Sequence, residues 1–345
     1  MVNLLFLTSL TLLCVLVLYW GFRCLPHRQW QIWATVPSYD RLSESWQGIN
    51  LTWYGLLTAS ANLTALTVSF CLLGSLGISR TAMVVLACAL LAGCLPASRW
   101  VARLVEGKSH TFTVGGAVFV GFVLAPCIIA ILNALKGRPL PMLPTLTALA
   151  IGYAFGEGIG RLACISYGCC YGKPLGECGP LLRKLFGRFH FVFRGETKKI
   201  AYASGLDGQA VVPIQALTAL LFCLTGLAGT ALFLAGHYGF AFLLVCLVTQ
   251  GWRVFSEMLR ADYRGRGKLS AYQIMGLLLL PYAVGLVLYY AAFPALPDLS
   301  MGLAALWHPA VLLALQAGWL IMFLFFGRSE VTGANLSFFV RQDRI

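Results

Sequence analysis

The chain has 345 residues, of which 59% are hydrophobic and only 11% are charged. A soluble domain normally carries about 25% charged residues, so the composition excludes an ordinary soluble enzyme, and it excludes intrinsic disorder as well. The formal net charge is +13, but no polar segment is large enough to form a nucleic-acid surface. We therefore predict no nucleic-acid partner and assign the basic excess to anionic headgroups and to membrane topology. The chain is predicted to be an all-α polytopic membrane protein.

Apolar stretches without charges predict about nine transmembrane helices. The first, at 2–22, is expected to be a retained helix, because no basic segment precedes it and no small-residue cleavage site follows it. Residues 208–252 contain no Asp, Glu, Lys or Arg. The break at 237–239 predicts two helices in this run, the second reaching about Arg260. The other predicted spans are about 51–77, 81–98, 111–135 and 142–168, followed by 271–293 and 302–327.

Nine spans place the connecting segments on alternating faces of the membrane. One face carries 19 Lys and Arg residues and the other carries 3. The basic face holds 23–50, 99–110, 169–207, 261–270 and the C-terminal tail. The positive-inside rule places that face in the cytoplasm.

Two groups of charged residues lie within predicted spans, where ionisable side chains are costly and therefore candidates for function. Glu157 and Arg161 are four residues apart, so they share a helix face and can neutralise each other. Arg253, Glu257 and Arg260 also share one face. Together the five charges sum to +1, which suits one anionic group, and the guanidinium fork suits phosphate. The alternative is that both groups are ion pairs at the membrane boundary that reach toward water.

Glycine and cysteine are concentrated around the first of these groups. The glycines, together with the pair Gly115 and Gly116, are consistent either with close helix packing or with backbone beside a ligand. Cys164, Cys169, Cys170 and Cys178 have a C-x4-C-C-x7-C spacing, which does not match the paired C-x2-C of common zinc sites. Three interpretations stay open: packing, a disulfide from Cys178 to Cys169 or Cys170, and a metal site or reactive thiolate.

Several segments, taken in order, resemble one family. Residues 160–172, GRLACISYGCCYG, are similar to a signature G-R-[IL]-G-[NC]-F-x-x-G-x-x-x-G. The remaining matches are Trp53-Tyr54-Gly55-Leu56 to W-Y-G-L, Val114-Gly115-Gly116 to H-G-G, Val212-Pro213-Ile214-Gln215 to H-P-S-Q, residues 253–262 to R-F-x-x-E-F-x-R-x-P-D, and residues 271–274 to G-Q-I-L-S. In these features the chain resembles the prolipoprotein diacylglyceryl transferases of bacteria.

The resemblance implies a seven-helix transferase-like core at 51–293 with a polar arm at 173–207. It leaves one extra N-terminal helix and loop at 1–50 and one extra C-terminal helix and tail at 294–345. The family moves the diacylglyceryl group of phosphatidylglycerol to a cysteine thiol of a lipoprotein precursor in the bacterial inner membrane and releases glycerol phosphate. No metal and no organic cofactor are implied.

The motif match also implies roles for individual residues. Arg161 and Arg253 would stabilise charge on the leaving phosphate, and Glu257 would orient or neutralise an arginine. The lipid and its phosphate would be bound by Tyr54, Gly115, Gly116, Gly172, Gln215 and Arg260. The family's histidine before Gly-Gly is Val114 here, and His110, four residues earlier, is a candidate to replace it.

Other departures weaken the acceptor side of the site. The His-Pro motif reads Val212-Pro213, the tyrosine after the family's glutamine is Leu217, the signature asparagine is Cys164, and the acidic position is Cys169. The arginines are kept while several polar groups for the thiol are absent. The acceptor is therefore either a lipoprotein cysteine or another nucleophile. The competing hypothesis is a lipid transporter or lipid-binding protein on the same scaffold.

Overall fold

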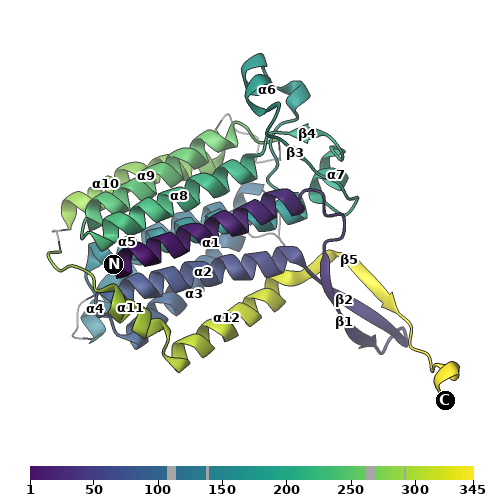
Figure 1. Cartoon of the computed structure of the whole chain (residues 1–345), viewed down its shortest axis with the longest axis horizontal. Helices are drawn as coiled ribbons and strands as arrows, with labels where there is room; N and C mark the ends of the chain where they lie inside the picture. Colours follow the sequence, from purple (N-terminus) through teal and green to yellow (C-terminus); the bar gives the residue numbers. More distant parts are fainter. Residues whose placement is uncertain (107–113, 137–139, 262–268, 291–292) are drawn as a thin grey trace.

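The computed structural model describes residues 1–106, 114–136, 140–261, 269–290 and 293–345, and the fold is a bundle of long, roughly aligned helices (Figure 1). Among these residues, nine helices are long and apolar enough to cross a membrane. They are α1 (Val2–Cys24), α2 (Trp53–Ser75), α3 (Arg80–Glu106), α4 (Val114–Lys136), α5 (Met142–Tyr167), α8 (Ile214–Leu234), α9 (Tyr238–Glu257), α10 (Ala271–Tyr289) and α12 (Pro309–Gly327). The predicted fold class and the predicted number of spans are confirmed.

Helix α5 is the most buried of these helices and lies between α2, α8 and α9. Glycines allow its backbone to come close to its neighbours. A Cβ on Gly152 would lie 2.7 Å from the carbonyl oxygen of Ala65 in α2, and one on Gly158 would lie 2.8 Å from Cys223 Sγ in α8. Any larger residue at either position would push the helices apart. This packing holds Glu157 and Arg161 of α5 in the middle of the bundle.

A small sheet lies at the same end of the bundle as the polar arm (Figure 1). Strands β1 (Ile32–Asp40), β2 (Ser45–Thr52) and β5 (Arg328–Leu336) form an antiparallel sheet in the order β1-β2-β5. Trp46 is opposite Tyr39 on one side and Leu336 on the other. The sheet brings the segment after α1 together with the segment after α12, an arrangement that the sequence did not predict.

The polar arm between α5 and α8 is ordered into short elements. They are η1 (Leu175–Glu177), α6 (Pro180–Phe186), β3 (Phe191–Val192), α7 (Lys199–Ser204) and β4 (Ala210–Val211). Lys198 is completely buried, and its Nζ donates hydrogen bonds to the carbonyl oxygens of Leu25, at 3.1 Å, and Ser166, at 2.7 Å. Burial lowers the pKa of Lys198 to about 8. This side chain fastens the arm to the ends of α1 and α5.

Predicted and observed boundaries differ in three places. The span predicted at 302–327 is two helices, α11 (Leu299–Leu306) and α12, because His308 caps α12 and Pro309 occupies its first turn. Residues 99–106 of the loop predicted at 99–110 belong to α3, and residues 107–110 lie outside the described residues. The span predicted from residue 51 begins at Trp53, because Thr52 is still extended and its hydroxyl caps the helix. The last described 3-10 turn is η2 (Gln342–Arg344).

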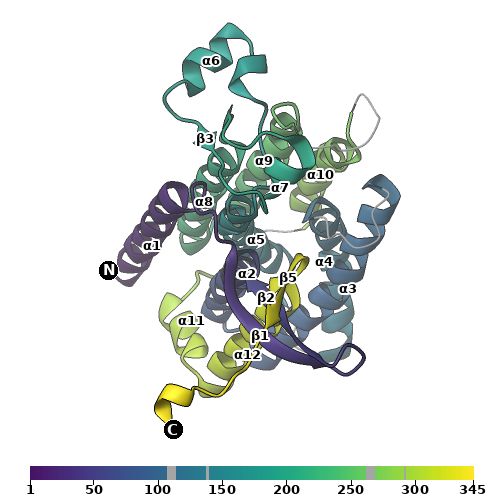
Figure 2. The ribbon, with the colours of Figure 1, turned by 90° about the vertical axis from the view of Figure 1, so that its right-hand side faces the viewer.

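Viewed from the end that carries the sheet, α5 lies near the centre of the bundle (Figure 2). The arm with α6 and α7 lies above it, the β1-β2-β5 sheet lies below it, and α3 and α4 lie to one side. The end of α5 therefore lies between the arm and the sheet in this view.

Candidate functional site

A carboxylate held by two arginines forms the centre of the site. Glu157 accepts hydrogen bonds from Arg253 Nη2 at 2.8 and 2.7 Å, one to each carboxylate oxygen, and its Oε1 also accepts from Arg161 Nη2. The Glu157 side chain is only 3% exposed. A buried carboxylate requires this degree of pairing, because an unpaired one would lose far more solvation energy than it regains. The prediction that Glu157 and Arg161 form an ion pair is confirmed.

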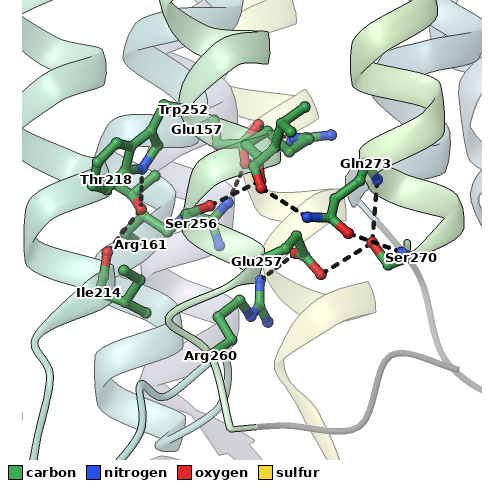
Figure 3. Close-up of polar contacts among 12 residues, drawn as sticks. Glu157, Arg161, Ile214, Thr218, Trp252, Ser256, Glu257, Arg260, Ser270 and Gln273 are labelled. Atoms are coloured by element: carbon green, nitrogen blue, oxygen red, sulfur yellow. Dashed lines mark hydrogen bonds and ion pairs between the residues drawn. The ribbon is translucent and has the colours of Figure 1, made fainter. Parts of the chain in front are cut away.

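The second predicted group of charges, Arg253, Glu257 and Arg260, forms two separate ion pairs. Arg253 pairs with Glu157 and not with Glu257, whereas Glu257 accepts a hydrogen bond at 3.3 Å from Arg260 Nη1 (Figure 3). Ser270 Oγ lies 3.5 Å from the other Glu257 oxygen and caps α10. Glu257 thus forms its ion pair with Arg260, and its role in the site stays a prediction.

These charged groups line a cavity of about 1210 Å³ that opens between the bundle, the sheet and the arm. Helix α5 contributes Glu157 and Arg161, and α9 contributes Arg253 and Glu257. Strand β5 contributes residues 328–332, and the arm contributes 194–197. The cavity is thus lined by charged side chains and is bounded by transmembrane helices, by β5 and by the arm.

Three of the predicted lipid-binding residues, Tyr54, Gly115 and Arg260, lie on the cavity wall. Tyr54 and Gly115 line it, and a Cβ on Gly115 would lie 2.5 Å from the ring of Tyr272. Gly116 instead faces α3, where a Cβ would lie 2.5 Å from Val101. Gly116 therefore packs α4 against α3, one of the two roles that the glycine pair left open.

The other predicted residues act on the backbone around the cavity. Gly172 forms a β-bridge with Arg260, and it has no room for a side chain because Val212 lies against it. Gln215 is fully buried, and its Nε2 donates to the carbonyl oxygen of Cys169 at 2.9 Å. His110 lies outside the described residues.

The cysteine cluster contains no disulfide. None of the twelve cysteines, all of which lie in the described residues, forms a disulfide. The pairing of Cys178 with Cys169 or Cys170 is therefore wrong, and the Cys178 thiol instead donates to the carbonyl oxygen of Pro174. Cys164, Cys169 and Cys170 are together, with their sulfur atoms all within 4.8 Å of one another. Hydrogen bonds with Cys164 and Cys170, together with burial, raise the pKa of the Cys169 thiol well above its usual range. Cys169 is therefore protonated at neutral pH and is a poor nucleophile.

Comparison with known proteins identifies the family. The family described as prolipoprotein diacylglyceryl transferase matches residues 43–289, from β2 to the end of α10. The chain belongs to this family of transferases. A relative named phosphatidylglycerol--prolipoprotein diacylglyceryl transferase, from Synechococcus elongatus, is 26% identical over 269 residues, which cover 72% of this chain and 87% of the relative. The predicted family is confirmed, and with it the prediction that the protein is a membrane-embedded transferase.

Glu157, Arg161 and Arg253 lie within the region that matches the family, residues 43–289. Other residues that line the cavity lie outside that region. Residues 328–332 of β5 line the cavity but follow the matched region. Helix α12 packs against α2, where Trp319 Nε1 donates to Ser60 Oγ at 3.2 Å. The chain beyond the matched region thus lines the cavity and packs against the helix bundle.

The sequence analysis treated Glu157 only as a residue that neutralises Arg161. The structure makes it a candidate functional residue in its own right. It accepts from both central arginines, and Tyr153, one turn earlier, lies 3.5 Å from Arg253 Nη2. The signal was the presence of an acidic residue in the middle of an apolar, glycine-rich helix. The pairing with Arg253 joins residues 96 positions apart, so spacing alone did not reveal it.

A second cavity, of about 1090 Å³, adjoins the first between α3 and α12. The two cavities share Phe325, Arg328 and Glu330. Arg99 and Arg103 of α3 add positive charge to its wall, and its apolar lining residues are Leu95, Pro96, Trp100, Ile321, Leu324 and Phe325. Such a groove combines a cationic end with an apolar flank.

Proposed function

We propose that the protein transfers the diacylglyceryl group of phosphatidylglycerol to an acceptor, most simply the cysteine thiol of a prolipoprotein, and releases glycerol phosphate. The observation that carries the proposal is the Arg161–Glu157–Arg253 group on the wall of a large cavity. The name of the Synechococcus relative supports both substrates.

The charge of the central group matches a phosphodiester. Two arginines on one glutamate leave a net charge of +1, and the Glu257–Arg260 pair adds none. The phosphate of phosphatidylglycerol carries one negative charge, so it would neutralise the group. Among the described residues, Arg161 Nε is buried without a hydrogen-bond partner. An unsatisfied buried donor costs about 1–3 kcal/mol, and a phosphate oxygen would relieve that cost.

The reaction is an alkyl transfer in which one bond forms and one breaks. The acceptor sulfur attacks the glyceryl carbon, the carbon–oxygen bond to phosphate breaks, and the phosphate ester leaves with the electron pair. The thiol loses one proton and the leaving phosphate gains one. Arginines fixed beside that phosphate would stabilise its developing charge, an effect that is largest in a site sheltered from water.

The second cavity supplies a route for the lipid. A phospholipid moving between α3 and α12 could keep its chains against the apolar residues while its phosphate follows Arg99, Arg103 and Arg328 toward the main cavity. We further propose that 51–293 acts as the transferase core, with 1–50 and 294–345 as additions to it, and that the membrane is the bacterial inner membrane.

The test uses purified protein, phosphatidylglycerol labelled in its headgroup glycerol, and a lipoprotein-signal peptide with one cysteine. The wild type should release labelled glycerol phosphate in step with peptide lipidation, and Arg161→Ala should abolish both. Arg341→Ala, a change at an exposed tail arginine, is the matched control and should retain activity. Lipid binding without release would favour the transporter or lipid-binding alternative, and release without peptide lipidation would point to a different acceptor.

A further inference from the structure

The three clustered thiols have the spacing of a metal-ligand set. Cys164 lies in the last turns of α5, and Cys169 and Cys170 follow directly after the helix. Their sulfur atoms lie within 4.8 Å of one another. Three thiolates around one zinc-sized ion, at bond lengths of about 2.3 Å, lie about 3.8 Å apart. Small side-chain rotations would therefore bring the three sulfurs to coordination distance.

The backbone after α5 is shaped to bring these thiols together. Cys170 has a positive φ of 57°, a conformation that is uncommon for residues other than glycine. The neighbouring carbonyl, that of Cys169, is held by the buried amide of Gln215. Strained conformations persist where the surrounding structure enforces them, and they are often found at functional sites. The strain here places two consecutive cysteines beside the thiol of Cys164.

We propose that Cys164, Cys169 and Cys170 form a binding site for a soft, thiophilic divalent metal ion such as Zn²⁺ or Cd²⁺. Sulfur ligands select soft ions over Mg²⁺ and Ca²⁺. All three cysteines line the main cavity, so a fourth coordination position faces the cavity and is open to water or to a substrate thiol. Binding releases three protons and leaves a metal–thiolate group with a charge of −1.

The site is placed to control the phosphate-binding arginines. Cys164 follows Arg161 by three residues, so the two lie on the same face of α5. A metal–thiolate group with one negative charge would compete with the phosphate for Arg161. Occupancy should therefore inhibit the transferase, an effect that rests on the proposed function, whereas the metal binding itself does not.

The experiment measures Cd²⁺ binding to the reduced, metal-free protein through the ultraviolet thiolate-to-metal charge-transfer band. The wild type should bind one Cd²⁺ per chain at this site. The triple variant C164S/C169S/C170S should lose this binding step, while Cys178→Ser, a change at a nearby cysteine outside the cluster, should retain it. Cys164→Ser alone should weaken binding at least about 100-fold, since even loss of a supporting outer-shell partner costs 10–100-fold.

The possible results separate the two claims. A triple variant that is folded and binds Cd²⁺ as the wild type does, or a wild type with no saturable binding, would overturn the site. If the triple variant does not fold, Cys164→Ser decides, and unchanged affinity in that variant overturns the site. Binding that leaves glycerol phosphate release unchanged would overturn only the inhibitory coupling.

Discussion

Replacing Glu157 with glutamine tests whether the central group is a working part of the site or only an internal ion pair. The substitution keeps the shape of the side chain but removes the charge that Arg161 and Arg253 share. Two buried guanidiniums then remain without their counterion, and the net charge of the group rises from +1 to +2. Removing one partner of a buried pair costs about 3–5 kcal/mol, so Glu157→Gln should lower the free energy of unfolding by about that amount.

Turnover should fall as well, because both arginines lose the contact that fixes their position. A displacement of about 1 Å in a positioning group can cost 100-fold in rate. We expect a loss of about 100-fold in kcat with a smaller change in KM, since the added positive charge favours the anionic lipid. Glycerol phosphate release, measured well below the unfolding temperature, separates this loss from the loss of stability.

Glu196→Gln is the matched control, because Glu196 lines the same cavity but is exposed on the arm. It should change stability by less than about 0.5 kcal/mol and leave kcat close to that of the wild type. A Glu157→Gln protein that is less stable yet turns over normally would refute the placement of the phosphate at this group. Unchanged stability would refute the buried ion-pair argument itself.

Three further predictions concern Arg161, the two cysteines after α5, and Lys198. Arg161→Lys should retain the fold but restore little of the activity lost in Arg161→Ala, because an ammonium group cannot form the bidentate fork; near-normal glycerol phosphate release would remove Arg161 from the site. The double change Cys169→Ser, Cys170→Ser should leave turnover within about tenfold of the wild type, because the acceptor supplies the reacting thiol; complete loss in a folded protein would indicate a covalent intermediate on the enzyme. Burial lowers the pKa of Lys198 from 10.5 to about 8. Between these two pH values the unfolded chain binds more protons at Lys198 than the folded chain does. The free energy of unfolding should therefore rise with pH over this range by up to about 3 kcal/mol. Lys198→Met should remove that rise in pH-dependent unfolding experiments, and an identical pH profile in both proteins would contradict it.

The sequence predicted the spans because lipid imposes a simple rule on it. Every backbone polar group in the membrane must be paired internally, so a long apolar run is a helix with few alternatives. The error at 302–327 shows the limit of that rule. Leu306 and Pro309 both lie in apolar sequence, yet the helix is interrupted between them because a proline starts a new one.

The sheet and the central ion pair were missed for a different reason. Strands β2 and β5 are paired although almost the whole bundle separates them in sequence. Strand propensity depends strongly on the neighbouring strand, so neither segment alone indicated a sheet. The same holds for Arg253, which pairs with a residue on another helix. Local spacing identified which charges lie in the membrane, but only the packing of α5 against α9 showed how they combine.

The orientation of the protein in the membrane is the prediction with the largest consequence. The family function requires the arm and the cavity to lie on the extracytoplasmic side of the membrane, because the lipoprotein precursor arrives on that side. The positive-inside rule instead places the face with 19 Lys and Arg in the cytoplasm. That rule is weaker for long segments, and the arm at 169–207 supplies 7 of the 19, yet 12 against 3 remain without it. We favour the family orientation, because the acceptor determines where the site must open.

Labelling of single cysteines decides between the two orientations. A cysteine near Lys198 would report poorly on the arm, since the Lys198 side chain is fully buried. Leu185 in α6 is 61% exposed, and Leu296, in the segment just before α11, is 74% exposed. Helices α6 and α11 lie at opposite ends of the bundle (Figure 1). In a background without other reactive thiols, a membrane-impermeant maleimide applied to intact spheroplasts should label Leu185→Cys and not Leu296→Cys. The reverse pattern would place the cavity in the cytoplasm, and a lipoprotein cysteine could then no longer be the acceptor.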